Sequence, residues 1–101
     1  MKKIVAETPG SISYLALSYV DDSLQALQLD GVTANDKNIT TNKWPIWSYE
    51  HMYTNGKPEK ALADFLEYMV SDDVQNGPVK ELGYLPITSM KVERAADGTV
   101  K

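Results

Sequence analysis

Residues 58–70, PEKALADFLEYMV, carry the clearest structural pattern in the chain. Their large apolar residues recur at spacings of three and one, which gathers them on one face of a helix: Leu62, Phe65, Leu66, Met69 and Val70. Pro58 suits the first helical turn, because a proline there loses no hydrogen bond. Since an isolated helix of this length is marginal in water, the pattern predicts a helix that docks on the rest of the protein.

Shorter elements are expected after this helix. Ser71 is suited to cap a second helical segment, which Gly77-Pro78 interrupts. Residues 78–82 are expected to make one more turn, and Gly83 is expected to end it as a C-terminal cap. The tail from Lys91 to Lys101 is polar and is expected to fray.

The residues before the helix predict strands and turns. Runs rich in apolar and aromatic residues predict extended segments; they are residues 12–17, 26–29, 32–33 and 44–53, with a short one at 84–87. Turns are expected at Thr8-Pro9-Gly10-Ser11, Asp30-Gly31 and residues 54–58. Residues 2–7 are expected to form a helical turn, and residues 34–43 a loop or a single helical turn.

Composition excludes several classes of protein. The chain has 101 residues, a net charge of −4, 43% hydrophobic and 24% charged residues, which is ordinary for a folded chain of one domain or less. The acidic balance argues against nucleic-acid binding. With no cysteine, disulfides, thiolate catalysis and Cys-ligated metals are excluded. No apolar run reaches the ~20 residues of a membrane span, and the apolar core of a secretion signal is missing after Met1-Lys2-Lys3.

Few residues point to chemistry. His51 is the sole histidine and lacks metal-motif partners. The pairs Asp21-Asp22 and Asp72-Asp73 are interpreted as solvated turn and helix-start charges rather than cation ligands. Asn38-Ile39-Thr40 matches a glycosylation sequon, which short peptides often do by chance.

Two further stretches are candidate binding sites. The aromatic residues Trp44, Trp47, Tyr49 and Tyr53 favour packing over base stacking, because no arginine or lysine is interleaved with them. The turn at residues 8–11 could offer N–H groups to an anion, a weak signal on its own. No nucleophile, base and oxyanion site come together, so the chain is predicted not to be an enzyme, with catalysis by Asp21, Asp22 or His51 as the least favoured alternative.

The order of six short motifs resembles phosphate-binding proteins of bacterial phosphate ABC transporters, of the type II periplasmic (solute-binding) protein family. The motifs stand in the family's order between about residues 5 and 89: TPGSISYL at 8–15, LQLDGV at 27–32, NI at 38–39 before WPI at 44–46, YTNGKP at 53–58, ADFLEY at 63–68 with Ser71 and Gln75, and GYLPI at 83–87. The family often carries an arginine where Ser48 stands here.

This resemblance implies a fold and a set of partners. It implies an α/β fold: part of a type II binding-protein lobe, with a short mixed sheet and flanking helices, over residues 1–90, followed by a polar tail over 91–101. Family members are about three times as long, with phosphate between two lobes, so an incomplete lobe is expected to dimerise or swap. The implied protein is extracytoplasmic, as a periplasmic protein or membrane-anchored lipoprotein, and delivers inorganic phosphate to an ABC transporter permease without a cofactor.

The resemblance places the family's phosphate ligands upstream of this chain. They lie at early Ser/Thr turns, at an aspartate and at an Arg…Ser-Gly-Thr helix start, none of which matches residues 1–101. No ligand residue, metal site or catalytic residue is therefore assigned, and Arg94 alone in a polar tail does not make a dry anion site. Two alternatives remain: an interaction module that presents Trp44–Tyr53 to a protein partner, and a binding protein for molybdate or sulfate.

Overall fold

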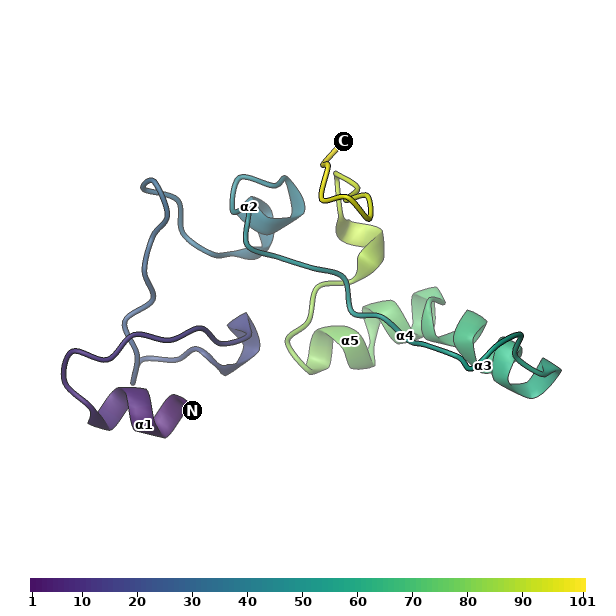
Figure 1. Ribbon diagram of the computed structural model, residues 1–101, viewed down its shortest axis with the longest axis horizontal. Helices are drawn as coiled ribbons and strands as arrows, with labels where there is room; N and C mark the ends of the chain where they lie inside the picture. Colours follow the sequence, from purple (N-terminus) through teal and green to yellow (C-terminus); the bar gives the residue numbers. More distant parts are fainter.

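The computed structural model describes all residues from Met1 to Lys101. It is an elongated molecule of 51 × 30 × 26 Å built from short helices joined by irregular chain (Figure 1). The elements are α1 (Lys2–Glu7), the 3-10 helix η1 (Leu17–Tyr19), α2 (Asp36–Thr40), α3 (Lys60–Met69), α4 (Asp72–Asn76), α5 (Pro78–Glu81) and the 3-10 helix η2 (Ile87–Ser89). Helices α3, α4 and α5 follow one another in a row at one end of the molecule (Figure 1).

Helix α3 confirms the helix predicted from residues 58–70, with ends slightly inside the predicted ones. Lys60 and Asp64 form an ion pair one turn apart, with 2.6 Å between Nζ and Oδ2, which adds a few tenths of a kcal/mol. The expected docking of its apolar stripe is incomplete, because Leu62 and Phe65 are about half exposed. The helix therefore forms without the covering layer that its sequence predicts.

The turns around α4 and α5 lie where glycine and serine predicted them. Ser71 occupies the N-cap position of α4, although its side chain makes no capping hydrogen bond. Gly77 separates α4 from α5, and a Cβ there would lie 2.8 Å from the backbone oxygen of Asp73. Gly83 follows α5 with a φ of 79°, and its N–H donates to the Lys80 oxygen at 2.9 Å. The predicted C-terminal cap is confirmed.

The predicted α/β fold with a short mixed sheet is wrong for this structure, which contains no sheet. Only two isolated bridges occur, Leu29 with Val32 and Arg94 with Val100. The segments 12–17, 26–29 and 44–53 form no strands. The physical reason is that a strand is stabilised by hydrogen bonds to a neighbouring strand, and within these 101 residues no segment takes that position.

Two of the predicted turns are present although the predicted sheet is not. Asp30 and Gly31 have φ values of 50° and 76°, and the Leu29–Val32 bridge closes over them with N···O distances of 3.0 and 2.8 Å. This is the tight turn that an Asp-Gly pair favours. The turn over residues 8–11 is also present, with the Ser11 N–H donating to the Thr8 oxygen at 3.2 Å.

The packed core is very small. Five of 101 residues are buried, and Ile39 and Val74 are the buried hydrophobic ones. The accessible surface is 8232 Å², against about 5,700 Å² for a packed chain of this mass. The radius of gyration is 16.5 Å, against about 13 Å for a compact domain of this length. Much apolar surface that a folded domain would bury therefore faces solvent. No helix has the length and apolar character needed to cross a membrane.

Candidate functional site

An aromatic row runs along the irregular segment between α2 and α3. The rings of Trp47 and Tyr49 lie 5.3 Å apart edge to face, those of Tyr49 and His51 6.4 Å apart, and those of His51 and Tyr53 6.0 Å apart. Alternate residues share a face only where the backbone is extended. Yet no backbone–backbone hydrogen bond involves residues 48–53. The row is thus strand-like in its side chains but unpaired along both backbone edges.

Arg94 attaches the C-terminal residues to the start of this row. Its guanidinium lies 4.1 Å from the centre of the Trp47 ring, Nη2 donates to the Pro45 oxygen at 2.9 Å, and Nη1 donates to the Trp47 oxygen. Its backbone N–H donates to the Tyr49 hydroxyl at 3.2 Å. Cation–π contact and charge-assisted hydrogen bonds together make this a specific attachment. Both Nη groups of the one arginine are therefore engaged within the chain.

The tail differs from the frayed segment that its polarity predicts. Glu93 and Lys101 exchange two backbone hydrogen bonds of 2.9 Å, and the Ala95 N–H donates to the Thr99 oxygen at 2.8 Å. Asp97 accepts from the Thr99 N–H at 2.9 Å, and this hydrogen bond lowers the pKa of its carboxyl. A small hairpin forms because an Asp and a Gly close the turn locally.

A large apolar hollow is lined by residues from Val5 to Met90. Its volume is about 1270 Å³, and 26 of its 40 lining residues are hydrophobic. The hollow is lined by N-terminal residues, by residues of the aromatic segment 44–52, and by residues in or next to α3, α4 and α5. Several of its apolar side chains are more than half exposed: Ile12, Tyr14, Leu27, Ile46, Val70 and Leu82. Exposed apolar surface on this scale is typical of an interface rather than of a finished monomer surface.

A smaller hollow of about 630 Å³ is lined by three lysines, Lys37, Lys80 and Lys91, together with Asp36 and hydroxyl side chains. All three lysines are exposed, so water and salt screen their charge. The arrangement can attract an anion but holds no cationic donor out of water. The sequence gives no sign of this hollow, because Lys37 and Lys91 are far apart in the chain.

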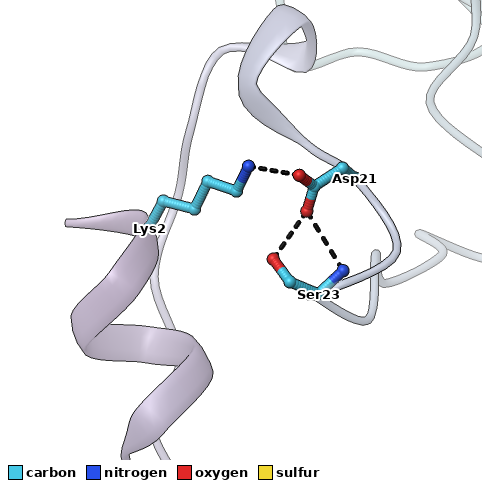
Figure 2. A network of polar contacts seen from close by, with 3 residues as sticks. All are labelled: Lys2, Asp21 and Ser23. Carbon is cyan, nitrogen blue, oxygen red and sulfur yellow. Dashed lines mark hydrogen bonds and ion pairs between the residues drawn. The ribbon is translucent and has the colours of Figure 1, made fainter.

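Asp21 sits in a polar network at the N-terminal end of the molecule (Figure 2). Lys2 Nζ donates to Asp21 Oδ2, and Asp21 Oδ1 accepts from the Ser23 N–H at 3.0 Å and from the Ser23 hydroxyl at 2.6 Å. These hydrogen bonds, led by that of Lys2, lower the pKa of Asp21 from 3.8 to about 2. The network connects α1 to the loop after η1, so Asp21 has a structural role.

We expect the Asp21 carboxyl to titrate with a midpoint near 2 in a carbon-detected NMR titration. Because its pKa is lower in the folded chain, the network's stabilising effect is present above pH 4 and is lost as the pH falls from about 4 to about 2. Lys2→Met should raise the midpoint toward 3.8. Lys3→Met is the matched control, because Lys3 pairs with Glu7 instead. Equal shifts in both variants would contradict the assignment.

The other predicted site residues are not brought together. His51 is exposed between Tyr49 and Tyr53, and Asp72 and Asp73 are exposed in the first turn of α4. No three histidine, cysteine or acidic side chains are placed to hold a metal ion. The turn at residues 8–11 folds on itself, because the Ser11 hydroxyl donates to the oxygens of Thr8 and Val5 at 2.7 and 3.0 Å.

Asn38 has a structural role that the sequon reading missed. Its Nδ2 donates to the Thr33 oxygen at 2.9 Å, and its backbone N–H donates to the Asn35 side chain, the N-cap of α2. The backbone oxygen of Asn38 accepts from the Trp44 N–H at 2.9 Å. Asn38 therefore joins the loop before α2 to the start of the aromatic segment. The nitrogen that a glycan would use is already a hydrogen-bond donor.

Gln75 is the second structural residue without a chemical signature in the sequence. It is buried in α4, where its Nε2 donates to the Met69 oxygen at 2.9 Å and its Oε1 accepts from the Ile87 N–H at 2.8 Å. It therefore links the end of α3 to η2. In the sequence, Gln75 is marked only by its place beside the ADFLEY motif, one of the six motifs that resemble the family.

The comparisons with known proteins agree with the resemblance. The chain is 48% identical over 99 residues to "Phosphate-binding protein PstS" of Bacillus subtilis (strain 168), which covers 97% of this chain and 33% of that protein. It is 31% identical over 96 residues to "Phosphate-binding protein PstS 2" of two Streptococcus agalactiae strains, covering 94% of this chain and 32% of those proteins. No protein-family model matches.

These relatives confirm the family resemblance predicted from the six motifs. Their names state binding of phosphate and no reaction. The chain spans about a third of the length of each of them. Along nearly its whole length, this chain is therefore similar in sequence to a segment of the phosphate-binding proteins named PstS, and that segment makes up about one third of each of them.

Proposed function

We propose that this chain is part of an extracytoplasmic phosphate-binding protein that captures inorganic phosphate and delivers it to an ABC transporter permease. The observation that carries the proposal is the 48% identity over 97% of the chain to a phosphate-binding protein. In such a protein no bond is made or broken, so no catalytic residue or cofactor is required.

The main phosphate ligands lie outside residues 1–101 in this proposal. Two observations support this. The sole arginine is engaged with Pro45 and Trp47, and the lysine-lined hollow is open to solvent. Tight anion capture needs desolvated, charge-assisted donors, and neither place offers them. In this proposal, residues 1–101 form part of the fold of the protein, and the phosphate ligands come from the rest of its polypeptide.

A hybrid protein tests the proposal. In it, this chain replaces the matching third of the Bacillus subtilis relative. We expect the hybrid to bind phosphate in isothermal titration calorimetry and the isolated chain to show no binding at the same concentrations. Molybdate and sulfate are titrated in parallel, since a related oxyanion is the alternative ligand. A hybrid that is folded but binds none of the three anions would overturn the proposal.

A further inference from the structure

We infer that Asn55 is a site of spontaneous deamidation, at which the chain's own backbone converts the side-chain amide into a carboxylate, and that the fold protects the second Asn-Gly pair of the chain from the same reaction. The two pairs are Asn55-Gly56 and Asn76-Gly77. The reaction needs water and no enzyme. It does not involve phosphate, so its outcome is independent of the proposed function.

Deamidation joins two groups that are neighbours in the sequence. The backbone nitrogen of Gly56 attacks Cγ of Asn55: an N–Cγ bond forms, the Cγ–Nδ2 bond breaks, and the side-chain nitrogen leaves as ammonia with the proton of the Gly56 amide. Water then opens the five-membered succinimide at either of its carbonyl carbons, which leaves aspartate or isoaspartate in place of asparagine. Glycine favours the attack because it has no Cβ to obstruct the close approach of its nitrogen. A modified chain has one more negative charge than the formal −4.

The Asn55-Gly56 pair lies in an open turn between the aromatic row and α3. Both residues are exposed, and the Gly56 N–H makes no hydrogen bond to another backbone group. A Cβ built on Gly56 would meet nothing within 4 Å. The hydrogen bond that spans the turn runs from the Thr54 hydroxyl to the Gly56 oxygen, at 2.8 Å, and leaves the attacking nitrogen free. Nothing in the structure therefore hinders ring closure at this pair.

The Asn76-Gly77 pair is held by the end of α4. Asn76 is exposed as well, but the Gly77 N–H donates to the Asp73 oxygen at 3.1 Å. A Cβ built on Gly77 would lie 2.8 Å from that same oxygen, so the backbone of Gly77 is packed against the helix. The nitrogen can attack only after this hydrogen bond opens, and local opening of this kind has a free-energy cost. The same dipeptide is therefore reactive in the turn and protected at the helix end.

The other three asparagines differ from Asn55 in two ways. Each is followed by a residue with a Cβ, and each side chain makes a hydrogen bond. Asn35 accepts from a backbone N–H at 2.9 Å, and Nδ2 of Asn38 donates to a backbone oxygen at 2.9 Å. Oδ1 of Asn42 accepts from the Trp47 indole at 2.8 Å. We expect all three to deamidate more slowly than Asn55.

Peptide mapping by mass spectrometry measures the two rates in one sample of the folded chain, kept at physiological temperature and slightly alkaline pH. Trypsin separates the pairs into peptides 44–60 and 61–80, because it cleaves after Lys60 but not at Lys57, which Pro58 follows. We expect peptide 44–60 to deamidate at least ~10-fold faster than peptide 61–80, because α4 must open before Gly77 reacts. Equal rates, or faster loss at Asn76, would overturn the inference.

The same measurement in guanidinium chloride separates the effect of the fold from that of the sequence. Both pairs are Asn-Gly, so in the unfolded chain their rates should lie within about 3-fold of each other, since only weak local structure remains there. The rise should come mainly from peptide 61–80, which loses the protection of α4. A rate ratio that persists in the denaturant would show that neighbouring residues, and not the helix, set the difference, and would overturn the protection of Asn76.

A variant and a product assay test the route through the succinimide. Gly56→Ala should slow the reaction at Asn55 at least ~5-fold, because the added Cβ obstructs the attacking nitrogen, and should leave the rate of peptide 61–80 unchanged. An isoaspartyl methyltransferase with labelled S-adenosylmethionine should label modified peptide 44–60, because ring opening yields isoaspartate as well as aspartate. An unchanged rate in Gly56→Ala, or a product that contains aspartate alone, would overturn the attack by the Gly56 nitrogen.

Discussion

Replacing Gly83 with alanine is expected to lower the free energy of unfolding by about 2–4 kcal/mol. Gly83 has a φ of 79°, a conformation that costs a residue with a Cβ roughly 1–2 kcal/mol. A Cβ there would also lie 2.7 Å from the Cβ of Ser18, and relieving such an overlap costs about 1–3 kcal/mol. The lower flexibility of unfolded alanine offsets a small part of the sum.

Urea unfolding followed by circular dichroism measures this loss, and Gly56→Ala is its control. Gly56 also has a φ of 79°, but a Cβ there would meet nothing within 4 Å. The control should lose only the cost of the backbone conformation, about 1–2 kcal/mol. The difference between the two variants isolates the close approach of Gly83 to Ser18, which joins the C-terminal helices to η1. Equal losses would show that this approach contributes nothing.

The elements that the sequence predicted correctly all depend on neighbours within a few residues. Helix α3 follows from the spacing of its apolar residues, and the turn at Asp30-Gly31 follows from positive φ values that these residues tolerate. The cap at Gly83 follows from the same preference. Each of these signals is satisfied by hydrogen bonds inside its own segment, so each forms here without help from the rest of a protein.

The sheet and the site contacts depend on distant residues, and sequence reasoning could not place them. Residues 44–53 have the composition of a strand, but strands form only beside a partner. The contacts of Arg94 with Pro45 and Trp47 span 49 and 47 residues. The Lys2–Asp21 pair spans 19 residues. No periodicity or spacing encodes such pairs, so the role of Arg94 appears only in the structure.

Replacing Gln75 with alanine is expected to cost about 2–4 kcal/mol in the free energy of unfolding. Gln75 is 8% exposed and makes the two hydrogen bonds that connect the Met69 oxygen with the Ile87 N–H. Each such bond contributes about 0.5–1.5 kcal/mol, and a partly buried group left without its partner costs about 1–3 kcal/mol. Alanine removes both bonds and leaves the Met69 oxygen and the Ile87 N–H without these partners.

The decisive measurement for Gln75 is hydrogen exchange at the Ile87 amide, read alongside urea unfolding. In the parent chain this amide donates to Gln75 at 2.8 Å, so its exchange in the alanine variant should rise at least ~10-fold. Gln28→Ala is the control, because exposed Gln28 makes one hydrogen bond, of 3.2 Å, to the Thr33 hydroxyl. It should change stability by no more than about 0.5 kcal/mol. If the Ile87 amide exchanges at the parent rate in Gln75→Ala, η2 is held by its own turn and not by α4. The contribution of Gln75 would then be confined to its bond with Met69, at the junction of α3 and α4.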